Sequence, residues 1–476
     1  MDIREAELIY EAGKEAVAKA LLEMDARTRV LEQQILALQK LIASLSTNST
    51  NSSKPPSSDG PKVEKPKKKR SSRSPGGQKG HKGHKRELRP VEEMDDVHDH
   101  YPHACEKCGA PLDPDSCLET SNAERYQTFE LPKIKPIMEE HRCHELGCTC
   151  GHRTRAELPP EVAQSQFGPR VHGAIAYFTS VHKIGRRGMA EILNTLFGLN
   201  LCLGSVCNCI ERVSPELEPV AEEVRQTLPE SNNLNIDETG WKCKGDRRYL
   251  WVFVSPLAVY FSIAASRGAK VLRSVLGDVF QGVITSDDHS AYSSYQKKGI
   301  RQLCWAHIIR KLKALKDGRA SPDAYIFSKH MLNEVGRIFR CWHAFREGYI
   351  TREQLLNATT LMRARMKRYC QKYLASTDGE VRTRAKRLLD NWDHLFTFLT
   401  HEGVEPTNNR AEQAIRPAVQ WRKLCFGNQS DAGERFTERI LTVTRTCQLQ
   451  GKNSFHFLAE LMEAAFKGTP RPSLFN

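Results

Sequence analysis

Residues 234–264 read LNIDETGWKCKGDRRYLWVFVSPLAVYFSIA, and residues 282–287 read GVITSD. Short β-branched and aromatic runs between Gly- or Pro-containing turns predict three consecutive strands, at residues 234–238, 248–255 and 258–264. The stretch GAKVLRSVLGDVF that follows them predicts a helix, and GVITSD predicts a fourth strand that ends at Asp287. The segment is therefore expected to fold as a three-stranded meander, a helix and one more strand.

This order of elements is that of a ribonuclease H-like fold, in which the first strand and the end of the fourth each carry a carboxylate. Asp237 lies on the first predicted strand and Asp287 ends the fourth. Two carboxylates brought together repel each other unless cations neutralise them, so the pair predicts a divalent metal site. The alternative is that each Asp simply ends a strand or begins a turn.

A third carboxylate follows a long helical stretch. Residues 306–400 are rich in Lys, Arg, Leu and Ala with helical periodicity, which predicts an all-helical insertion. After it, residues 406–417 read PTNNRAEQAIRP, in which Asn408 or Asn409 can cap a helix and Glu412 falls near its first turn. Glu412 and Arg416 are four residues apart, so one helix face is expected to present a carboxylate to metal and a guanidinium to phosphate. A surface salt bridge is the alternative.

Length and composition indicate a soluble protein of several modules. The chain has 476 residues, of which 39% are hydrophobic and 27% charged, and no apolar run is long enough to span a membrane. The N-terminus lacks an apolar segment followed by a cleavage site, so we expect a cytoplasmic protein with reduced cysteines.

The N-terminal region has the pattern of a coiled coil. Between residues 17 and 45 apolar residues recur with alternating spacings of four and three, with Ile35 and Ile42 at a positions and Leu31, Leu38 and Leu45 at d positions. This choice favours a two-stranded parallel coiled coil. The alternative is a helix packed on its own domain.

A basic segment follows this helix. Between Lys54 and Arg86 there are 12 Lys or Arg residues and two acidic ones, a balance of +10 out of the net +14 of the chain. Its Gly, Ser and Pro content cannot form a core, so it is either a solvated tail or a flexible strap along phosphates. The strap interpretation assigns DNA contacts to Lys67, Lys68, Lys69, Arg70, Lys79 and Lys82.

Grouped cysteines indicate a small metal-binding module. Cys105 and Cys108 form a Cys-x2-Cys pair, and a second group follows at Cys143, Cys148 and Cys150. Thiolate pairs in reach of one ion suggest a structural Zn²⁺ held by Cys105, Cys108, Cys143 and Cys148, with Cys150 as an alternative ligand. A β-rich unit with incidental thiols remains the other interpretation. Residues 168–228 then look helical, including a weak helix-turn-helix pattern that plain helix packing also explains.

Six motifs in order carry a family resemblance: NSSKPPSSDG, GGQKGHKGH, NIDETGWK, TSDDHSAY, CWAHIIRK and NNRAEQAIRP. Together they resemble the insertion-sequence-66 family of bacterial transposases, over nearly the whole chain. The resemblance implies a leucine-zipper-like N-terminus, a zinc module, a DDE catalytic domain with a helical insertion, and Asp237, Asp287 and Glu412 as its acids. Asp288-His289 replaces the family's usual Gly-Tyr; we assign Asp287 as the second acid because it follows the strand directly.

The sequence thus predicts a multidomain α/β protein with an N-terminal coiled coil, a zinc-binding module and a ribonuclease H-like catalytic domain with a helical insertion. The expected parts are a coiled-coil helix (1–46), a basic linker (47–98), a zinc-binding module (99–160), a helical region (161–228), the first part of the catalytic core (229–305), the helical insertion (306–400), the second part of the core (401–446) and a C-terminal extension (447–476).

The expected activity is Mg²⁺-dependent cleavage and strand transfer of DNA, by two ions that Mn²⁺ can replace. Arg416, Lys423, Trp305 and His307 are candidate DNA contacts, with core packing as the alternative for Trp305. Expected partners are double-stranded DNA, a second copy of the chain or a higher oligomer, and accessory proteins of the same element, in the bacterial nucleoid. The competing functions are a DNA-binding or assembly protein without catalysis and a nuclease that does not join DNA.

Overall fold

The structure is a computed structural model that describes residues 3–45, 86–114, 124–297, 299–318 and 321–475. The chain divides into two compact units. The smaller unit comprises residues 64–137 and 196–198, and the larger one comprises residues 1–63, 138–195 and 199–476. Each is described by itself.

The smaller unit contains little regular structure in its described part. A short 3-10 helix, η2 (Val91–Glu93), precedes a tight turn at Cys105, which is closed by an isolated bridge between Ala104 and Pro111. Arg89 exchanges hydrogen bonds with the side chain of Gln127, which joins the two described segments of this unit.

The larger unit begins with two helices, α1 (Ile3–Glu11) and α2 (Lys14–Leu45). The predicted helix over residues 1–46 is thus divided in two, and the apolar series between residues 17 and 45 lies within α2, which has 32 residues. Leu21, Leu31, Ile35 and Leu38 of its apolar series are exposed, each by more than half. Pairing with a second copy, which would cover this series, stays a prediction.

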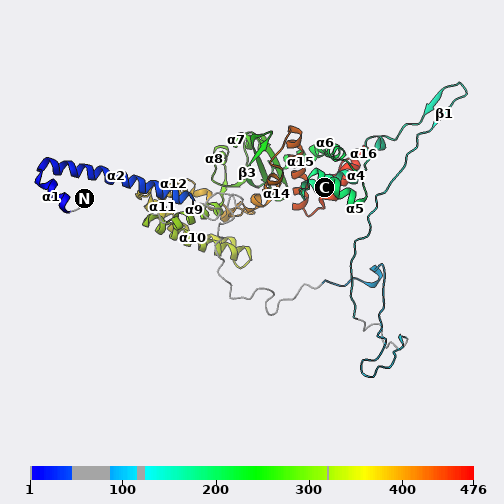
Figure 1. The fold of residues 1–476 in the computed structure, drawn as a ribbon, viewed down its shortest axis with the longest axis horizontal. Helices are drawn as coiled ribbons and strands as arrows, with labels where there is room; N and C mark the ends of the chain where they lie inside the picture. The colour runs from blue at the N-terminus through cyan, green and yellow to red at the C-terminus, as the bar shows by residue number, and fades with distance from the viewer. Residues whose placement is uncertain (1–2, 46–85, 115–123, 298, 319–320, 476) are drawn as a thin grey trace. The chain divides into compact units, whose positions relative to one another are not determined.

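A five-stranded mixed sheet, in which β3 is labelled in Figure 1, lies in the larger unit. Its strand order is β5-β4-β3-β6-β7. The first three strands form an antiparallel meander, and β6 and β7 join it in parallel. The helices α7 and α8 make the two crossovers, as parallel pairing requires. The bounds are β3 (Asn233–Cys243), β4 (Asp246–Val254), β5 (Val259–Ala264), α7 (Ala269–Leu276), β6 (Val283–Ser286), α8 (Ser290–Tyr295) and β7 (Arg301–Leu303).

The predicted order of three strands, a helix and a fourth strand is confirmed, and the first strand is longer than predicted. It continues to Cys243 because Lys244 and Gly245 form a two-residue hairpin turn, in which both residues have positive φ. Turns of this kind match the twist of antiparallel strands. β3 and β4 are therefore paired from Asn235 to the turn.

Both faces of the sheet are covered. On one face Leu234, Ile236 and Phe253 pack against α7 and α8. On the other face Trp241, Val252 and Phe261 pack against α14 (Asn409–Cys425) and α15 (Asp431–Leu449). Because side chains alternate along a strand, β3 presents its odd-numbered residues to α14 and its even-numbered ones to α8.

The stretch predicted to be a helical insertion is helical in its described residues, and it has a core of its own. Phe327, Met331, Met366 and Phe398 belong to this core, which is continuous with Leu303 and Trp305 at the end of the sheet. The helices are α9 (Trp305–Gly318), α10 (Pro322–Arg346), α11 (Arg352–Lys372), η5 (Tyr373–Ala375), α12 (Gly379–Asp390), η6 (Trp392–His394) and α13 (Thr397–Thr400).

The predicted helix-turn-helix region contains two helices joined by a turn at Gly198, which has a positive φ. Val206, Val213 and Val224 on α6 are buried, and α6 packs against α4 and α15, so one face of the second helix is used for packing. DNA reading by this pair stays a prediction. The elements around it are β1 (Glu145–Gly147), β2 (Arg153–Arg155), α3 (Pro160–Ala163), α4 (Pro169–Ser180), α5 (Arg186–Phe197), α6 (Leu203–Thr227) and α16 (Ser454–Lys467).

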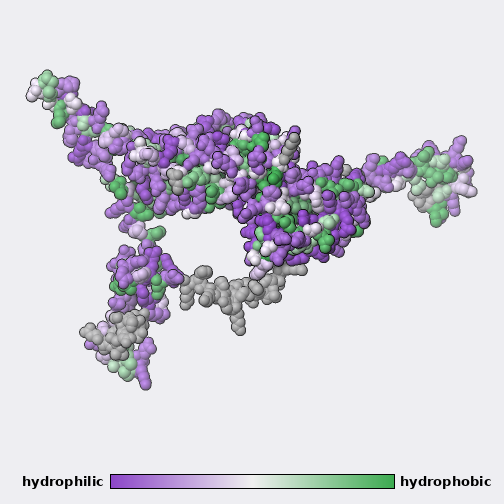
Figure 2. All heavy atoms as spheres, turned by 180° about the vertical axis from the view of Figure 1, so that it is seen from behind, coloured by the Kyte–Doolittle hydropathy of each residue, from purple (hydrophilic) through white to green (hydrophobic). Residues whose placement is uncertain are grey.

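Hydrophilic residues predominate on the face seen in Figure 2, with apolar residues scattered among them. Among the helices of the described residues, none combines the length and the apolar character that crossing a bilayer requires.

The loop after α14 is attached to the end of β3 through Gly427 and Asn428. Asn428 bonds to the backbone of Lys242 and Lys244, and its side chain accepts a hydrogen bond from Trp241 Nε1 at 2.6 Å. Gly427 has φ +109°, and a Cβ placed on it would lie 3.0 Å from the carbonyl carbon of Lys242. Only glycine fits this close approach.

We expect Gly427→Ala to destabilise the protein more than Gly451→Ala does. Both residues have positive φ, but a Cβ on Gly451 meets nothing within 4 Å. The conformational cost, about 1–2 kcal/mol, is common to both variants. Overpacking against Lys242 adds about 1–3 kcal/mol in Gly427→Ala alone. Urea unfolding measures the difference; equal losses in the two variants would contradict the close approach.

Candidate active site at the carboxyl end of β6

Asp237 and Asp287 are brought side by side by the pairing of β3 with β6. The two strands run parallel with Asn235 opposite Thr285. The pairing ends there: Asp237 lies two residues farther along β3, and Asp287 directly follows the last residue of β6. Paired residues of neighbouring strands point to the same face, and the strands lie about 4.8 Å apart. Asp237, an odd-numbered residue of β3, belongs to the sheet face that α14 covers, and the charge of Asp287 helps to raise its pKa, so the two carboxylates lie near each other.

α14 is fixed to this face by Asn408. The side chain of Asn408 is 1% exposed; it donates to the carbonyl of Ile236 at 2.7 Å and accepts from Asn235 Nδ2 at 3.0 Å. Asn408 is the N-cap residue of α14, but its side chain makes no capping bond. Of the two predicted caps, Asn408 or Asn409, Asn408 holds the N-cap position, but its side-chain amide bonds to β3 rather than to the first turn of α14. The attachment sets the first turn of α14 next to Asp237.

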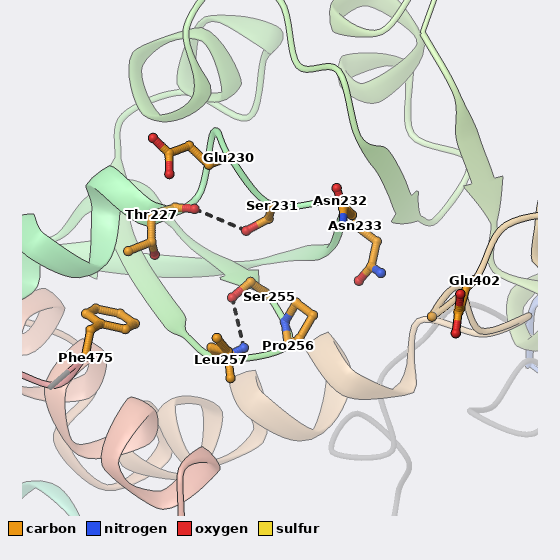
Figure 3. Close-up of a pocket in the computed structure, with 11 residues that line it drawn as sticks. Thr227, Glu230, Ser231, Asn232, Asn233, Ser255, Pro256, Leu257, Glu402 and Phe475 are labelled. Carbon is orange, nitrogen blue, oxygen red and sulfur yellow. Dashed lines mark hydrogen bonds between the residues drawn. The ribbon is translucent and has the colours of Figure 1, made fainter.

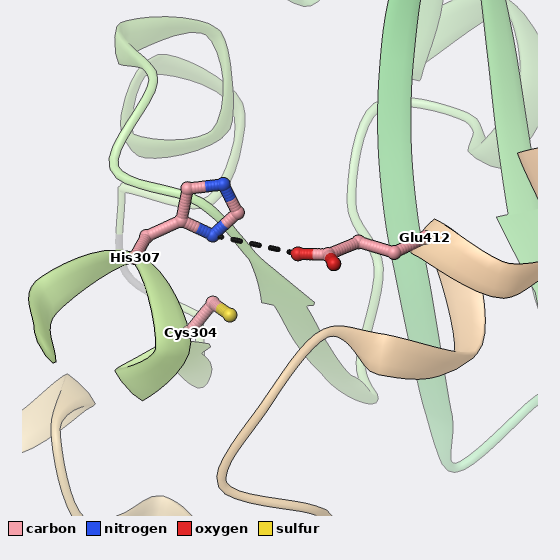
Figure 4. A group of neighbouring side chains, drawn as sticks. All are labelled: Cys304, His307 and Glu412. Atoms are coloured by element: carbon pink, nitrogen blue, oxygen red, sulfur yellow. Dashed lines mark ion pairs between the residues drawn. The ribbon is translucent and has the colours of Figure 1, made fainter. Parts of the chain in front are cut away.

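Glu412 lies in that first turn and contacts α9. Its Oε1 is 3.3 Å from Arg310 Nη2 and 3.7 Å from His307 Nδ1. Figure 4 shows Glu412 and His307 pointing toward each other, with the Cys304 thiol beside them. The ligand atoms of Cys304, His307 and Glu412 all lie within 4.8 Å of one another. Among the described residues, the groups that meet this limit do not include the three acids together.

The three acids nevertheless interact electrostatically, because Asp287 and Glu412 both affect the pKa of Asp237. Burial raises the pKa of Asp237 well above its ordinary value, and the charges of Glu238, Asp287 and Glu412 raise it further. Burial also lowers the pKa of His307, with the nearby Arg310 adding to this effect. A carboxylate that is buried among other carboxylates is ionised only at a cost, which a cation in the site would remove.

Glu238 is a fourth acid, which sequence reasoning missed. It points to the opposite sheet face, where its side chain is 1% exposed, binds Arg267 at 2.7 Å and accepts a hydrogen bond from Tyr292. Burial and then Asp287 raise the pKa of Glu238, while Tyr292 and Arg267 oppose this. The pair Asp237-Glu238 could have indicated this, because consecutive residues of a strand face opposite sides of the sheet, so a second acid was to be expected on the other face. Arg310 and Cys304 were missed because nothing local in the sequence links them to Glu412.

The residues predicted to contact DNA differ in their exposure to solvent. Arg416 and Lys423 are exposed on α14, and His307 is partly buried beside Glu412. Trp305 is 1% exposed, its Nε1 donates to the carbonyl of Leu395, and its ring packs on Phe396. A DNA-stacking role for Trp305 therefore does not fit this structure, and the alternative of core packing does. The basic residues predicted as contacts in the strap lie outside the described residues: Lys67, Lys68, Lys69, Arg70, Lys79 and Lys82.

The candidate zinc ligands form two turns of similar construction, one in each unit. In the first, the N–H of Gly109 donates to the carbonyl of Cys105, and hydrogen bonds from the backbone of Cys108 lower the pKa of the Cys105 thiol. In the second, between β1 and β2, the N–H of Gly151 donates to the carbonyl of Cys148, and the backbone of Cys150 lowers the pKa of the Cys148 thiol.

Each turn offers two thiols, which is half of a tetrahedral site. The partly buried Cys143 lies before β1, outside the second turn. Cys150, which looked like a poor ligand in the sequence, shares this turn with Cys148. A zinc ion bound by both turns stays a prediction.

A pocket elsewhere on the larger unit lacks the clustered acids and cations found around Asp237 and Glu412. It lies beside the start of β3 and is lined by Asn232, Asn233, Ser255, Leu257 and Phe475 among others (Figure 3). Its charged lining residues are Glu230 and Glu402, and no Lys or Arg of the described residues lines it. It suits neither a nucleic acid nor the chemistry of Asp237 and Asp287, which lie farther along the strands.

Comparison with known proteins gives the larger unit its family. The model of the transposase IS66 family matches residues 164–435, more than half of the chain and the whole of the sheet, the insertion and α14. The chain belongs to this family. Residues 3–87 match a second model, that of a family of unknown function. An uncharacterized protein of Sinorhizobium fredii, y4qI, is 25% identical over 288 residues, which are 54% of this chain and 52% of that protein. The chain thus spans about half the length of this curated relative.

We expect Asp237→Asn to stabilise the metal-free protein at neutral and higher pH. Because the folded-state pKa of Asp237 is raised, its contribution to stability is complete below the ordinary carboxyl pKa and is lost as the pH rises toward the raised value. The amide cannot ionise and avoids that loss, so its melting temperature in EDTA should exceed that of the wild type at about pH 8. The excess should shrink toward about pH 5; each ~1 kcal/mol corresponds to roughly 2–4 °C.

The matched control is Glu460→Gln, which removes an exposed carboxylate from α16. Mg²⁺ or Mn²⁺ should raise the melting temperature of the wild type and of this control but not that of Asp237→Asn. A melting temperature of Asp237→Asn at or below that of the wild type in alkaline buffer, with the metal response intact, would contradict the acidic site.

Proposed function

We propose that the chain is a DDE-type transposase, with Asp237, Asp287 and Glu412 as the acids of a ribonuclease H-like catalytic domain. The observation that carries this proposal is the charge interaction of Asp237, on β3, with Asp287, directly after the paired strand β6, and with Glu412 in the first turn of α14. The sheet order supports the same fold, with a meander followed by two parallel strands. Membership of the transposase IS66 family supports the activity.

The donors of the site fit Mg²⁺ or Mn²⁺. Carboxylate oxygens are the ligands that hard divalent cations prefer, and the raised pKa of Asp237 reflects a surplus of negative charge that such a cation would neutralise. Two such ions, when bound, would activate the attacking oxygen and stabilise the leaving oxygen at phosphorus. The ligands of two metal ions need not all contact one another, so this role does not require the oxygens of the three acids to lie within 4.8 Å of one another.

The residues of the chain would hold the acids in place and position DNA. Asn408 fixes α14 against β3, and Arg310 orients the carboxylate of Glu412. Water would attack the phosphodiester at the end of the element, breaking the P–O3′ bond and freeing a 3′-hydroxyl. That hydroxyl would then attack a target phosphodiester, with the target's 3′-oxygen leaving. Both steps are displacements at phosphorus in one site, so the same acids serve both.

The remaining assignments follow from this function. Double-stranded DNA is the substrate, and Arg416 and Lys423 on the exposed side of α14 are positioned to contact its phosphates. The basic strap would add salt-dependent affinity. The ligands expected for a structural Zn²⁺ are Cys105, Cys108, Cys143 and Cys148, with Cys150 as an alternative. The exposed apolar series of α2 would pair with a second copy of the chain. Accessory proteins of the same element are expected partners.

We expect Asp287→Asn and Glu412→Gln to abolish product formation while DNA binding persists. Loss of a metal-binding carboxylate should lower Mg²⁺-dependent joining by more than about 100-fold, since even residues that only support metal ligands cost roughly 10–100-fold. The measurement is a cleavage and strand-transfer assay on DNA carrying the ends of the element, with accessory proteins supplied. Asp246→Asn, which replaces an exposed carboxylate at the start of β4, is the matched control.

Two results would change the assignment. DNA binding by the wild type without cleavage or joining would favour a DNA-binding or assembly protein. Cleavage without joining would favour a nuclease of the same fold.

We also expect replacement of Leu31 and Leu38 by Asp to convert a dimer into a monomer. Both side chains are more than half exposed on α2 and lie on its predicted pairing face. Burying two carboxylates there would be unfavourable. Sedimentation velocity measures the mass, with the exposed Gln33→Asp as the control. A wild-type monomer, or a dimer that survives both substitutions, would leave α2 without a pairing role.

A further inference from the structure

Asp288 follows Asp287 directly but contacts the helical insertion. Its Oδ2 is 3.5 Å from Arg387 Nη1 on α12 and 4.0 Å from Lys311 Nζ on α9. The side chain of Asp288 is 26% exposed and that of Arg387 is 56% exposed, so solvent reaches this ion pair. Asp288 is thus paired with cations of the insertion, whereas Asp287 interacts electrostatically both with the acid Asp237 and with Lys311.

Two more cations face the same carboxylate. Arg301 at the start of β7 is 2% exposed, and Arg384 on α12 has a side chain that is 17% exposed; both interact electrostatically with Asp288. The Nε and Nη2 atoms of Arg301 and the Nε atom of Arg384 are buried and have no hydrogen-bond partner among the described residues. The ion pair of Arg384 with the exposed Glu380 is long, at 3.8 Å.

The insertion cluster, defined as Arg301, Lys311, Arg384 and Arg387 around Asp288, has more positive than negative charge. Burial lowers the pKa of Lys311, and Arg384 and Arg387 lower it further, although Asp288 opposes them. Burial lowers the pKa of Arg301 as well. Buried guanidinium donors without acceptors carry a desolvation cost, which an anion rich in acceptor oxygens would offset.

We propose that the insertion cluster is a phosphate-binding site for the DNA backbone, in which Asp288 serves as an internal counter-anion in the free protein. A phosphodiester presents oxygens to several cations at once, whereas the carboxylate of Asp288 reaches Lys311 and Arg387 within 4.0 Å. The inference rests on the proposed function for the identity of its ligand. The helical insertion would then bind the DNA backbone at Asp288, the residue that directly follows the catalytic acid Asp287.

The site can be tested with inorganic phosphate as the probe, using the full chain in EDTA. Thermal unfolding is compared in phosphate and in chloride at equal ionic strength. Phosphate should raise the melting temperature of the wild type. In Asp288→Asn the melting temperature in chloride should fall, because the cations lose their counter-anion, and the gain from phosphate should be larger than in the wild type. Arg387→Gln should reduce the gain by at least about half, because the cation with the most solvent access is lost.

Arg368→Gln is the matched control, because it removes an exposed arginine from α11 and should keep the wild-type gain. The absence of a phosphate gain in the wild type would overturn the site. So would equal gains in the wild type and Asp288→Asn, or in Arg387→Gln and Arg368→Gln. These outcomes are independent of catalysis, which the carboxylate variants test separately.

A second measurement distinguishes DNA from free phosphate. Binding of a duplex in EDTA at several salt concentrations should show that Arg387→Gln lowers the slope of log K against log salt by about one, the contribution of one phosphate contact. A wild-type slope in Arg387→Gln, with the phosphate gain still reduced, would overturn the assignment to the DNA backbone.

Discussion

The bond between Asn408 and the backbone of Ile236 is the constraint on which the candidate site depends. It joins two segments that are 172 residues apart in sequence. Later turns of α14 pack on Trp241 and Val252, and this bond fixes its first turn, which carries Glu412, next to the strand of Asp237. A buried amide suits this position, because it satisfies a strand carbonyl and the side chain of Asn235 together. The acids repel one another, so their arrangement must be enforced by neutral contacts of this kind.

The central sheet could be predicted from sequence because its strands are short apolar runs with clear turns between them. The same was true of Asp237 and Asp287, since each is tied to a strand end or a strand face. The contacts of Glu412 were harder to predict from the sequence. Arg310 and His307 reach it from the start of the insertion, and neither spacing nor periodicity shows which of the many cations there comes close.

Side-chain roles were harder to predict than elements. Asn408 has the residue type of a helix cap, yet a strand carbonyl competes successfully for its amide. Trp305 has the chemistry for stacking on bases, yet the start of the insertion core encloses it. Asp288 departs from the usual pattern of the family, and its ion pairs could not be deduced because its partners lie on two separate helices. In each case the local sequence allows more than one role for the side chain, and contacts with residues distant in sequence determine which role it has.

The insertion also leaves and re-enters the core at nearly the same point, because the N–H of Trp305 donates to the carbonyl of Pro406 at 3.0 Å. Segments whose ends meet can be lengthened, shortened or exchanged with little effect on the host, since the cost of closing a loop grows only slowly with its length. Evolution can therefore change the size of the insertion while keeping the strands and α14 intact. Relatives of this chain are free to differ most in the part that would hold DNA and least in the part that would cut it.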